Sequence, residues 1–442
     1  CHDINKWETF KKYCMRDVDV ERQIADKLKM YPISDEEHRL YVLDQIINDR
    51  GVLVDSELAE QAVKLNSIQT AVAVEQAYMI TGLENPNSET QLKQWLKEKG
   101  VEIESLSKKS VKSLADETDG DVSEMLKLRL LMAKTSVKKY EAVIRSVCSD
   151  NRVHGMMRFC GASRTGRWSG NILQPQSLPQ NHLPDLTLAR DIVKDGDFEM
   201  LNMTFGNVPN ALSELIRTVL IPKPNHRFIV ADFSAIEARV LSWLAGEQWR
   251  LDTFRNGGDI YCASASQMFR VPVEKHGVNG HLRQKGKISE LACGYGGSVG
   301  ALKNMGAVEM GVQENELQGL INDWRNANPH IVRFWYEVGN AAMKAIKEKT
   351  TVPLGKLVFA YERGILFIRL PSGRRLSYIK PRIGTNRFGG DSITYMGINS
   401  AKKWDRLETF GGKLTENIVQ GTARDLLANA LINAANAGYD TV

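Results

Sequence analysis

Two carboxylates stand close together where an apolar segment meets a predicted helix. Residues 228–231 read Phe-Ile-Val-Ala, which is typical of a short buried strand, and Asp232 follows directly. The end of such a strand lies at the rim of a sheet, where substrates and metals can reach it. Mg²⁺ prefers hard oxygen ligands and needs few from the protein when substrate phosphates supply others. Asp232 is therefore a candidate magnesium ligand, and the alternative is that it only begins a turn.

The second carboxylate, Glu237, also has two interpretations. It follows Asp232 by five residues, near the start of the predicted helix. Residues 234–237 match the capping box S-x-x-E, in which the glutamate bonds a backbone N–H and needs no substrate to explain it. On this stretch alone, the structural and the functional interpretation are equally supported.

A basic cluster further along the chain has a spacing that suits a triphosphate. In "HLRQKGKISELACGYGG", residues 281–297, the side chains of Arg283, Lys287, Leu291 and Tyr295 are spaced four residues apart. On a helix each such step overshoots one turn by roughly 40°, which predicts one slowly wrapping stripe. Arginine can bond a phosphate with two N–H groups, and a lysine one turn later adds a positive charge. A leucine and a tyrosine beyond them could face a sugar and a base, while a basic helix face that ends at a glycine is the alternative.

Helices and one short sheet must position these residues. Between residues 356 and 379 the hydrophobic period changes to two, and the turns "ERG" and "PSG" separate the runs, which predicts an antiparallel meander. Residues 161–181 read as a loop. Helices are predicted at residues 7–30, 121–147, 234–349 with interruptions, and 415–437. The fold class is therefore mixed α/β, with a large helical insertion between two sheet-containing pieces.

Composition sets broad limits on the class of protein. The 442 residues are too many for one ordinary domain, and 25% charged with 43% hydrophobic residues is typical of a globular chain. A net charge of +5 is only a weak indication of a polyanionic partner. The six cysteines are scattered without a C-x-x-C pair, which argues against a zinc site or a disulfide framework. No apolar run is long enough to cross a bilayer, so we expect no membrane partner.

Taken together, the clusters resemble motifs of the family A (polymerase I-type) DNA polymerases. "DFSAIEARVL" is similar to motif A, D-[YF]-S-x-I-E-x-R-x-L, and residues 283–296 fit motif B, R-x-x-x-K with a downstream Y-G. Further matches follow in the family's order: "AKTSVKKY" (thumb K-x-S-T-Y), "SRTGRWS" (T-G-R-x-S), "GGDIY" (D-I-H), "RLPSGRRLSY" (G-R turn) and "QGTARDLL" (Q-G-T-A-x-D). The resemblance spans nearly the whole chain and is greatest to members encoded by bacteriophages.

The resemblance implies a right-hand polymerase fold with palm, fingers and thumb, preceded by a remnant of a 3′–5′ exonuclease domain. The implied segments are the exonuclease remnant (1–30), the thumb and its base (31–155), the first palm part with motif A (156–246), the fingers with the motif B helix and the adjoining β-meander (247–380), and the second palm part, truncated before motif C (381–442). In the remnant, "YCMRDVDV" resembles the third exonuclease motif, Y-x-x-x-D, at Tyr13 and Asp17. One aspartate cannot assemble a two-metal hydrolytic site, so we expect no 3′–5′ degradation.

The implied activity is template-directed DNA synthesis, in which deoxynucleotides (dNTPs) are added to a primer 3′ end by two-metal phosphoryl transfer. Asp232 would be catalytic and bind both Mg²⁺ ions, and Glu237 would be the steric gate that fills the space of a ribose 2′-hydroxyl. The residues implied to bind the nucleotide, besides Glu237, are Arg283, Lys287, Leu291, Tyr295 and Tyr261. Those implied to bind primer–template DNA are Arg167, Thr165, Lys134, Ser136, Gln420 and Gly296.

The sequence departs from the family pattern at a few positions. Leu291 stands where motif B usually has an aromatic residue, and Tyr261 replaces a histidine that touches phosphate in relatives. Ala235 replaces a glutamine of motif A, and Glu416 stands where an asparagine is expected. These departures leave the reaction class unchanged and affect the details of nucleotide contact.

Two other functions are possible from the sequence. A single-subunit RNA polymerase would share the palm. Members of that class are expected to carry a smaller residue at the position of Glu237, which admits the 2′-hydroxyl. The second is a catalytically incomplete fragment that binds primer–template DNA. In the family, the helix similar to "QGTARDLL" leads to an H-D-E turn with the second metal-binding aspartate, and this sequence reaches Val442 before that turn.

We therefore expect the chain not to polymerise alone, and we expect the missing C-terminal segment of the same polymerase to be a partner that restores extension. The resemblance to phage-encoded members places the protein in the cytoplasm of a bacterial host.

Overall fold

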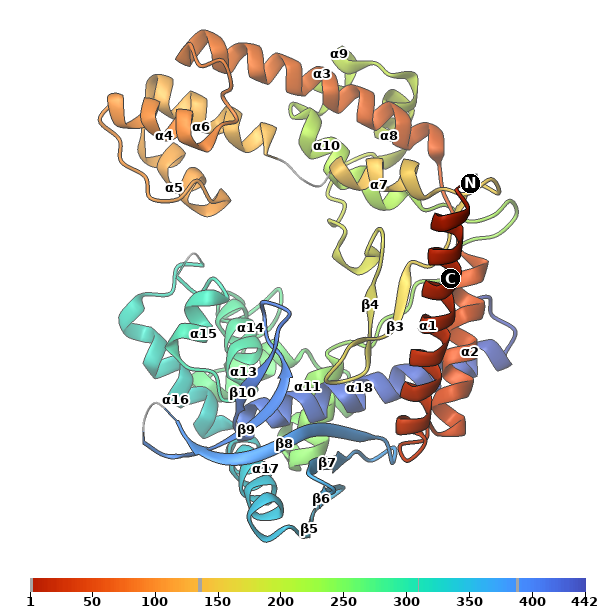
Figure 1. Ribbon diagram of the computed structural model, residues 1–442. Coiled ribbons are helices and arrows are strands. Elements are labelled where there is room, and N and C mark those ends of the chain that lie inside the picture. The colour runs from red at the N-terminus through yellow and green to blue at the C-terminus, as the bar shows by residue number, and fades with distance from the viewer. Residues whose placement is uncertain (1–2, 134–136, 309, 387–388) are drawn as a thin grey trace.

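Helices dominate the fold, and an antiparallel sheet lies in the lower part of the molecule, which confirms the mixed α/β prediction (Figure 1). The computed structural model describes residues 3–133, 137–308, 310–386 and 389–442. In Figure 1 a helical lobe from the first half of the chain lies at the top, and a second lobe from residues 248–327 lies at the lower left. No described helix combines the length and the apolar composition that a bilayer span requires.

The chain begins with two helices of different burial. The helix α1 (Ile4–Leu28) ends before Tyr31 and Pro32, as predicted, and none of its residues is buried. The helix α2 (Asp35–Arg50) begins after Ser34, whose hydroxyl accepts the backbone N–H of Glu37. It contacts β3 (Met157–Ala162) and α18 (Gly411–Asn436), so it lies against the centre of the molecule.

The upper lobe is organised along one long helix, α3. The N-terminal half of α3 packs in one hydrophobic core with α7–α10, and its C-terminal half packs in another with α4–α6. The helices are α3 (Ser56–Thr81), α4 (Glu89–Glu98), α5 (Lys108–Glu117), α6 (Gly120–Met132), α7 (Lys138–Ser146), α8 (Leu186–Asp195), α9 (Phe198–Phe205) and α10 (Val208–Leu215). The single helix predicted at 121–147 is therefore wrong, because α6 and α7 belong to different cores.

The lower lobe contains the helix expected to bind nucleotide, α14. It crosses α13 closely at Gly286, where an added Cβ would lie 2.3 Å from the carbonyl oxygen of Tyr261. Only a glycine allows this approach of the two helices. The helices of this lobe are α12 (Gln248–Arg255), α13 (Ile260–Phe269), α14 (Leu282–Cys293), α15 (Val299–Asn304) and α16 (Leu317–Ala327), and α17 (Pro329–Glu348) follows the lobe and packs against the sheet.

The predicted meander forms part of a larger antiparallel sheet, in the order β10-β9-β8-β7-β6-β5. The strands are β5 (Thr351–Leu354), β6 (Leu357–Glu362), β7 (Ile365–Arg369), β8 (Arg375–Thr385), β9 (Asp391–Ile398) and β10 (Trp404–Thr409). Buried side chains of this sheet share one core with α17 and α18. The helix α18 (Gly411–Asn436) matches the helix predicted at 415–437 and extends it by four residues at its start.

The strand predicted at 228–231 is not present. This segment belongs to no helix or strand and is unpaired among the described residues, and Val230 is 90% exposed. Its apolar composition gave the prediction, but a strand also needs a neighbour that satisfies its backbone groups. The following helix is α11 (Ile236–Ala245), which begins after Ala235.

Smaller elements connect the lobes. β1 (Val52–Leu53) pairs with β2 (Arg152–Val153), and β3 pairs with β4 (Arg167–Gly170) in a hairpin where a loop was predicted. Short 3₁₀ helices are η2 (Pro175–Ser177), η3 (Ile216–Val219) and η4 (Glu314–Glu316). The division into exonuclease remnant, thumb, palm and fingers stays a prediction, and its boundary at residue 380 falls inside β8.

Candidate functional site

Asp232 lies in the exposed segment that leads into α11, without a hydrogen bond or ion pair among the described residues. The turn after it is held by Arg239, whose Nε donates to the carbonyl oxygen of Ser234 at 2.8 Å. Ala235, in the same turn, has a left-handed φ of 51°. An accessible carboxylate without a protein partner has oxygen lone pairs free for a cation.

Glu237 does not form the capping box that the sequence allowed. The N-cap residue of α11 is Ala235, and no side chain bonds the free N–H groups at this helix start. The Tyr295 hydroxyl instead donates to Glu237 Oε2 at 2.9 Å, and Arg167 Nη1 lies 3.5 Å from Glu237 Oε1. Glu237 therefore joins three segments that are far apart in sequence, and the capping interpretation is wrong.

Tyr295 lies just beyond the end of α14 rather than on it. The predicted stripe of four side chains therefore holds on the helix only for Arg283, Lys287 and Leu291. Burial, together with the negative charge of Glu237 and the hydrogen bond to it, raises the pKa of the Tyr295 hydroxyl far above its ordinary value. The hydroxyl therefore stays protonated and acts as a donor to Glu237.

Arg283 is held at the base of the stripe by Asp259. Its Nε and Nη2 lie 2.9 and 2.8 Å from Asp259 Oδ2, and its guanidinium carbon lies 5.2 Å from the ring centre of Tyr261. Burial raises the pKa of the Asp259 carboxyl, but hydrogen bonds from Arg283 and from the N–H groups of Tyr261 and Cys262 hold that pKa below its ordinary value. Two predicted nucleotide-binding residues are thus in contact, and Asp259 orients both.

The other two side chains of the stripe are free for a ligand. Lys287 is half-buried and has no ion pair or hydrogen bond to the described residues. Leu291 is 49% exposed. A positive charge and an apolar side chain one turn apart are thus presented on one side of α14.

The exposure of Leu291 leads to a prediction about chain terminators. A tyrosine at this position would offer the incoming nucleotide a stacking surface, and its hydroxyl would offer a polar group that a dideoxynucleotide lacks. Stacking would favour both forms of the nucleotide alike, so the change in preference comes from the hydroxyl, whose hydrogen bond contributes about 1–1.5 kcal/mol. We expect Leu291→Tyr to raise dideoxynucleotide use relative to deoxynucleotide use by about tenfold.

The measurement is the ratio of kcat/KM for dideoxy and deoxy forms of one nucleotide in primer extension. Leu291→Phe is the matched control, because it adds the ring without the hydroxyl. Equal terminator sensitivity of the parent and Leu291→Tyr would show that this side chain does not face the nucleotide.

A buried ion pair packs α14 against neighbouring helices, and no motif in the sequence predicts it. Arg250 bonds both carboxylate oxygens of Glu290 at 2.7 and 2.6 Å, and their side chains are 1% and 5% exposed. Arg250 Nε also donates to Ser242 Oγ, and the indole N–H of Trp324 donates to Glu290 Oε1. Since removal of one partner of a buried pair is strongly destabilising, this network fixes α14 against α11, α12 and α16.

The residues predicted to bind DNA lie in several places. Arg167 begins β4, beside the buried Thr165 in the hairpin turn. Gln420 is half-buried on α18, and Gly296 follows α14 with a left-handed φ of 81°. Lys134 and Ser136 lie outside the described residues. Among the described ones, Arg167 lies 3.5 Å from a predicted nucleotide-binding residue, Glu237, and Gly296 directly follows another, Tyr295.

The residues of the predicted exonuclease remnant are both exposed on α1. Tyr13 and Asp17 have no buried neighbour on this helix. No group of three or more histidine, cysteine, aspartate or glutamate side chains that could hold a metal occurs among the described residues. The absence of 3′–5′ degradation stays a prediction, and release of nucleotides from single-stranded DNA by the purified protein would contradict it.

Comparison with known proteins places this geometry in a family. The profile of the DNA polymerase family A matches residues 56–441. A DNA polymerase of Bacillus phage SP02 is 52% identical over all of this chain and 68% of its own length. The thermostable DNA polymerase I of Thermus aquaticus is 27% identical over 51% of this chain and 22% of its own length.

One solved structure has a similar fold. It is the POL domain of Pol1 from M. smegmatis, in complex with a DNA primer-template and dNTP, with a TM-score of 0.59 and 19% identity. The match covers 91% of this chain and 59% of that one, and it confirms the predicted fold. The chain thus spans only part of the proteins that it matches. The extent of the profile and the identity to the phage enzyme lead to one conclusion: the chain belongs to DNA polymerase family A.

Proposed function

We propose that this protein adds deoxynucleotides to a primer 3′ end under the direction of a template. The observation that carries the proposal is the junction at Glu237. There the motif A helix, the residue after the motif B helix and the T-G-R hairpin meet through Tyr295 and Arg167. These are the segments that the family resemblance assigns to the nucleotide sugar, the template base and the primer.

The chemistry of phosphoryl transfer needs cations at Asp232. Family A DNA polymerases depend on divalent metals, and the free, accessible carboxylate of Asp232 fits one ligand of Mg²⁺. When bound, two such ions would supply the positive charge that activates the primer hydroxyl and neutralises the pyrophosphate. Asp232 would hold the ions from the turn that Arg239 fixes.

The residues of α14 would position the triphosphate. Lys287 offers an unpaired ammonium group, and Arg283 offers a guanidinium group that Asp259 already orients. A triphosphate must compete with Asp259 for Arg283, or bind the N–H groups of Arg283 that Asp259 leaves free. Electrostatic stabilisation of this kind needs no bond making by the protein, only fixed charges at the right place.

A second carboxylate beside Asp232 would complete a two-metal site. Residues 228–233 lie outside the described helices and strands and are exposed, and Ile229 and Val230 are 70% and 90% exposed. We propose that a further strand of the polymerase pairs here and brings that carboxylate. Slow hydrogen exchange at amides 229–231 in a preparation that extends primers would support the pairing, and fast exchange there would contradict it.

The function is tested by binding and by extension. We expect the protein to bind a primer–template duplex. In the presence of Mg²⁺, we expect the dNTP that matches the template base to tighten this binding more than a mismatched dNTP does. Failure to bind the duplex would overturn the proposal. Mg²⁺-dependent extension by the 442 residues alone would support it and contradict the expectation that this chain does not polymerise alone.

The rival functions make different predictions in the same assays. An RNA polymerase would select ribonucleotides, which membership of the DNA polymerase family A does not favour. A DNA-binding fragment would bind the duplex without any preference for the matching dNTP. The similarity to a phage enzyme supports the proposal that the protein acts in the cytoplasm of a bacterial host.

A further inference from the structure

The turn between β3 and β4, which carries Thr165 and Arg167, is held by an arginine from α18. Arg424 Nε donates to the carbonyl oxygen of Gly166 at 3.0 Å. Its guanidinium carbon lies 4.9 Å from the ring centre of Trp168 and 5.5 Å from that of Phe159. Arg424 therefore contacts the turn and both strands of the hairpin.

A carboxylate on α2 fixes the guanidinium group of Arg424. Glu37 accepts from Nη1 at 2.5 Å and from Nη2 at 2.8 Å, and the Arg424 side chain is only 1% exposed. Hydrogen bonds to Glu37 offset the effect of burial and raise the pKa of Arg424. A buried arginine held at both terminal nitrogens has little freedom, so its Nε–H points in one direction.

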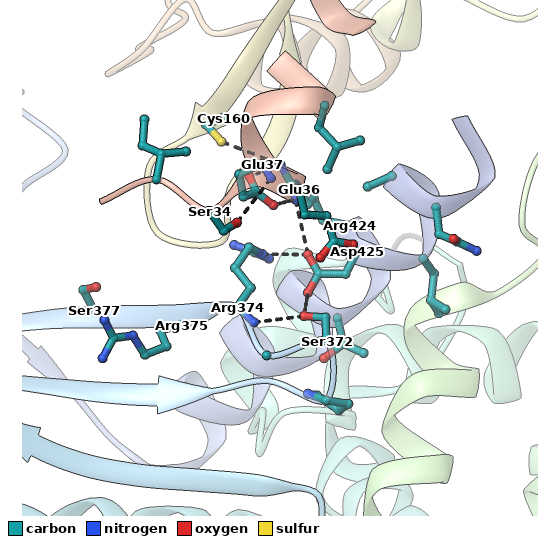
Figure 2. Close-up of a pocket in the computed structure, with 18 of the residues that line it drawn as sticks. Ser34, Glu36, Glu37, Cys160, Ser372, Arg374, Arg375, Ser377, Arg424 and Asp425 are labelled. Carbon is teal, nitrogen blue, oxygen red and sulfur yellow. Dashed lines mark hydrogen bonds and ion pairs between the residues drawn. The ribbon is translucent and has the colours of Figure 1, made fainter. Parts of the chain in front are cut away.

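A second arginine packs against the same turn. Gly166 has a φ of 76°, and a Cβ added there would lie 2.7 Å from Arg374 Nη1. Arg374 is held in turn by Asp425, at 2.6 Å, and by the carbonyl oxygen of Gly421, at 2.9 Å. Figure 2 shows Arg374, Asp425, Arg424 and Glu37 linked by these contacts.

A cavity adjoins these polar contacts. Glu37, Cys160, Arg374, Arg424 and Asp425 lie on the wall of a cavity of about 1290 Å³ (Figure 2). Arg424 therefore holds the turn by a hydrogen bond and ring contacts, beside the packing of Phe159 against Trp168.

We propose that Arg424 is a positioning residue for primer–template binding that acts through Arg167. The inference rests on the proposed function and deepens it. Arg424 fixes Gly166, the next residue is Arg167, and Arg167 reaches Glu237 at the nucleotide gate. Gln420 stands one turn before Arg424 on α18, so the same helix carries a predicted DNA contact and the residue that orients another.

A double-mutant cycle with Arg167 tests the proposal. Arg424→Lys keeps the positive charge beside Glu37 but loses the fork and the Nε–H bond to Gly166. We expect Arg424→Lys to raise the Kd for primer–template about fivefold and Arg167→Ala to raise it about tenfold. The double variant is expected to match Arg167→Ala alone, because Arg424 acts only through Arg167.

Arg250→Lys is the matched control. It removes an equally buried, bidentate arginine that pairs with Glu290 in the other lobe. Both lysine variants are expected to lower Tm. In the double variant of Arg250→Lys with Arg167→Ala, the fold-change in Kd should equal the product of the two single fold-changes, because the two sites act independently. Two outcomes would overturn the proposal. One is a double variant of Arg424→Lys and Arg167→Ala whose fold-change in Kd equals the product of the single fold-changes. The other is an unchanged Kd in either single variant.

Hydrogen exchange gives a readout that does not require DNA. The amide of Gly166 donates to the carbonyl oxygen of Ala162 at 2.8 Å, and we expect its exchange to accelerate at least fivefold in Arg424→Lys and in Glu37→Gln. The same amide should be unchanged in Arg250→Lys. Unchanged exchange at Gly166 in the first two variants would contradict the positioning role. Failure of the parent protein to bind DNA would count against the proposed function alone.

Discussion

Asp232→Asn is expected to reduce the rate of primer extension by about a thousandfold. The amide keeps the size of the side chain but loses the negative charge that, in the proposed function, would hold the cations. Charge stabilisation by the metals contributes several kcal/mol, and each 1.36 kcal/mol changes the rate tenfold. The measurement is single-turnover extension at saturating Mg²⁺ and dNTP, in a preparation of the parent protein that extends primers.

Binding separates loss of chemistry from loss of structure in this variant. Because Asp232 has no protein partner among the described residues, the asparagine should leave Tm and primer–template affinity unchanged. Asp252→Asn, at an exposed position on α12, is the matched control and should extend at the parental rate. Extension by Asp232→Asn within tenfold of the parent would show that other groups hold the metals.

The sequence predicted the elements with strong periodicity, and the structure confirms them. The period-two runs after residue 356 form neighbouring antiparallel strands β6–β8, and the apolar pattern near the C-terminus forms α18. Such patterns can be read locally because each buries one face of its own element. The family motifs placed Glu237, Tyr295 and Arg167 in one predicted site, and the three side chains are in contact.

The rest depended on partners that no local pattern contains. The apolar segment at 228–231 has the composition of a strand but lacks a neighbouring strand among the described residues. The capping box predicted at 234–237 does not form, because Glu237 instead accepts a hydrogen bond from Tyr295. Arg250 with Glu290, and Arg424 with Glu37, join residues 40 and 387 positions apart. The sequence alone does not distinguish a buried charged residue from an exposed one, because the partner that neutralises the buried charge is brought to it only by the fold.

The second large effect is expected at the nucleotide gate. Glu237→Ala should raise the use of ribonucleotides relative to deoxynucleotides on the order of 100-fold, because the alanine opens the space of the 2′-hydroxyl. Glu237→Gln keeps the size of the side chain and should retain most of the discrimination, although it weakens the ion pair with Arg167. The measurement is kcat/KM for each sugar form of one nucleotide, with ternary-complex affinity as a second readout.

Tyr295→Phe tests whether the gate depends on its hydrogen bond as well as on its size. The Tyr295 hydroxyl holds Glu237 Oε2 at 2.9 Å, and phenylalanine keeps the ring while releasing the carboxylate. A freed glutamate still occupies the space in some of its rotamers, so we expect only about a tenfold relaxation of sugar discrimination. If Tyr295→Phe relaxes discrimination as much as Glu237→Ala, the hydrogen bond sets the gate. If Glu237→Ala has no effect, Glu237 only links Tyr295 to Arg167 and another side chain excludes the ribose.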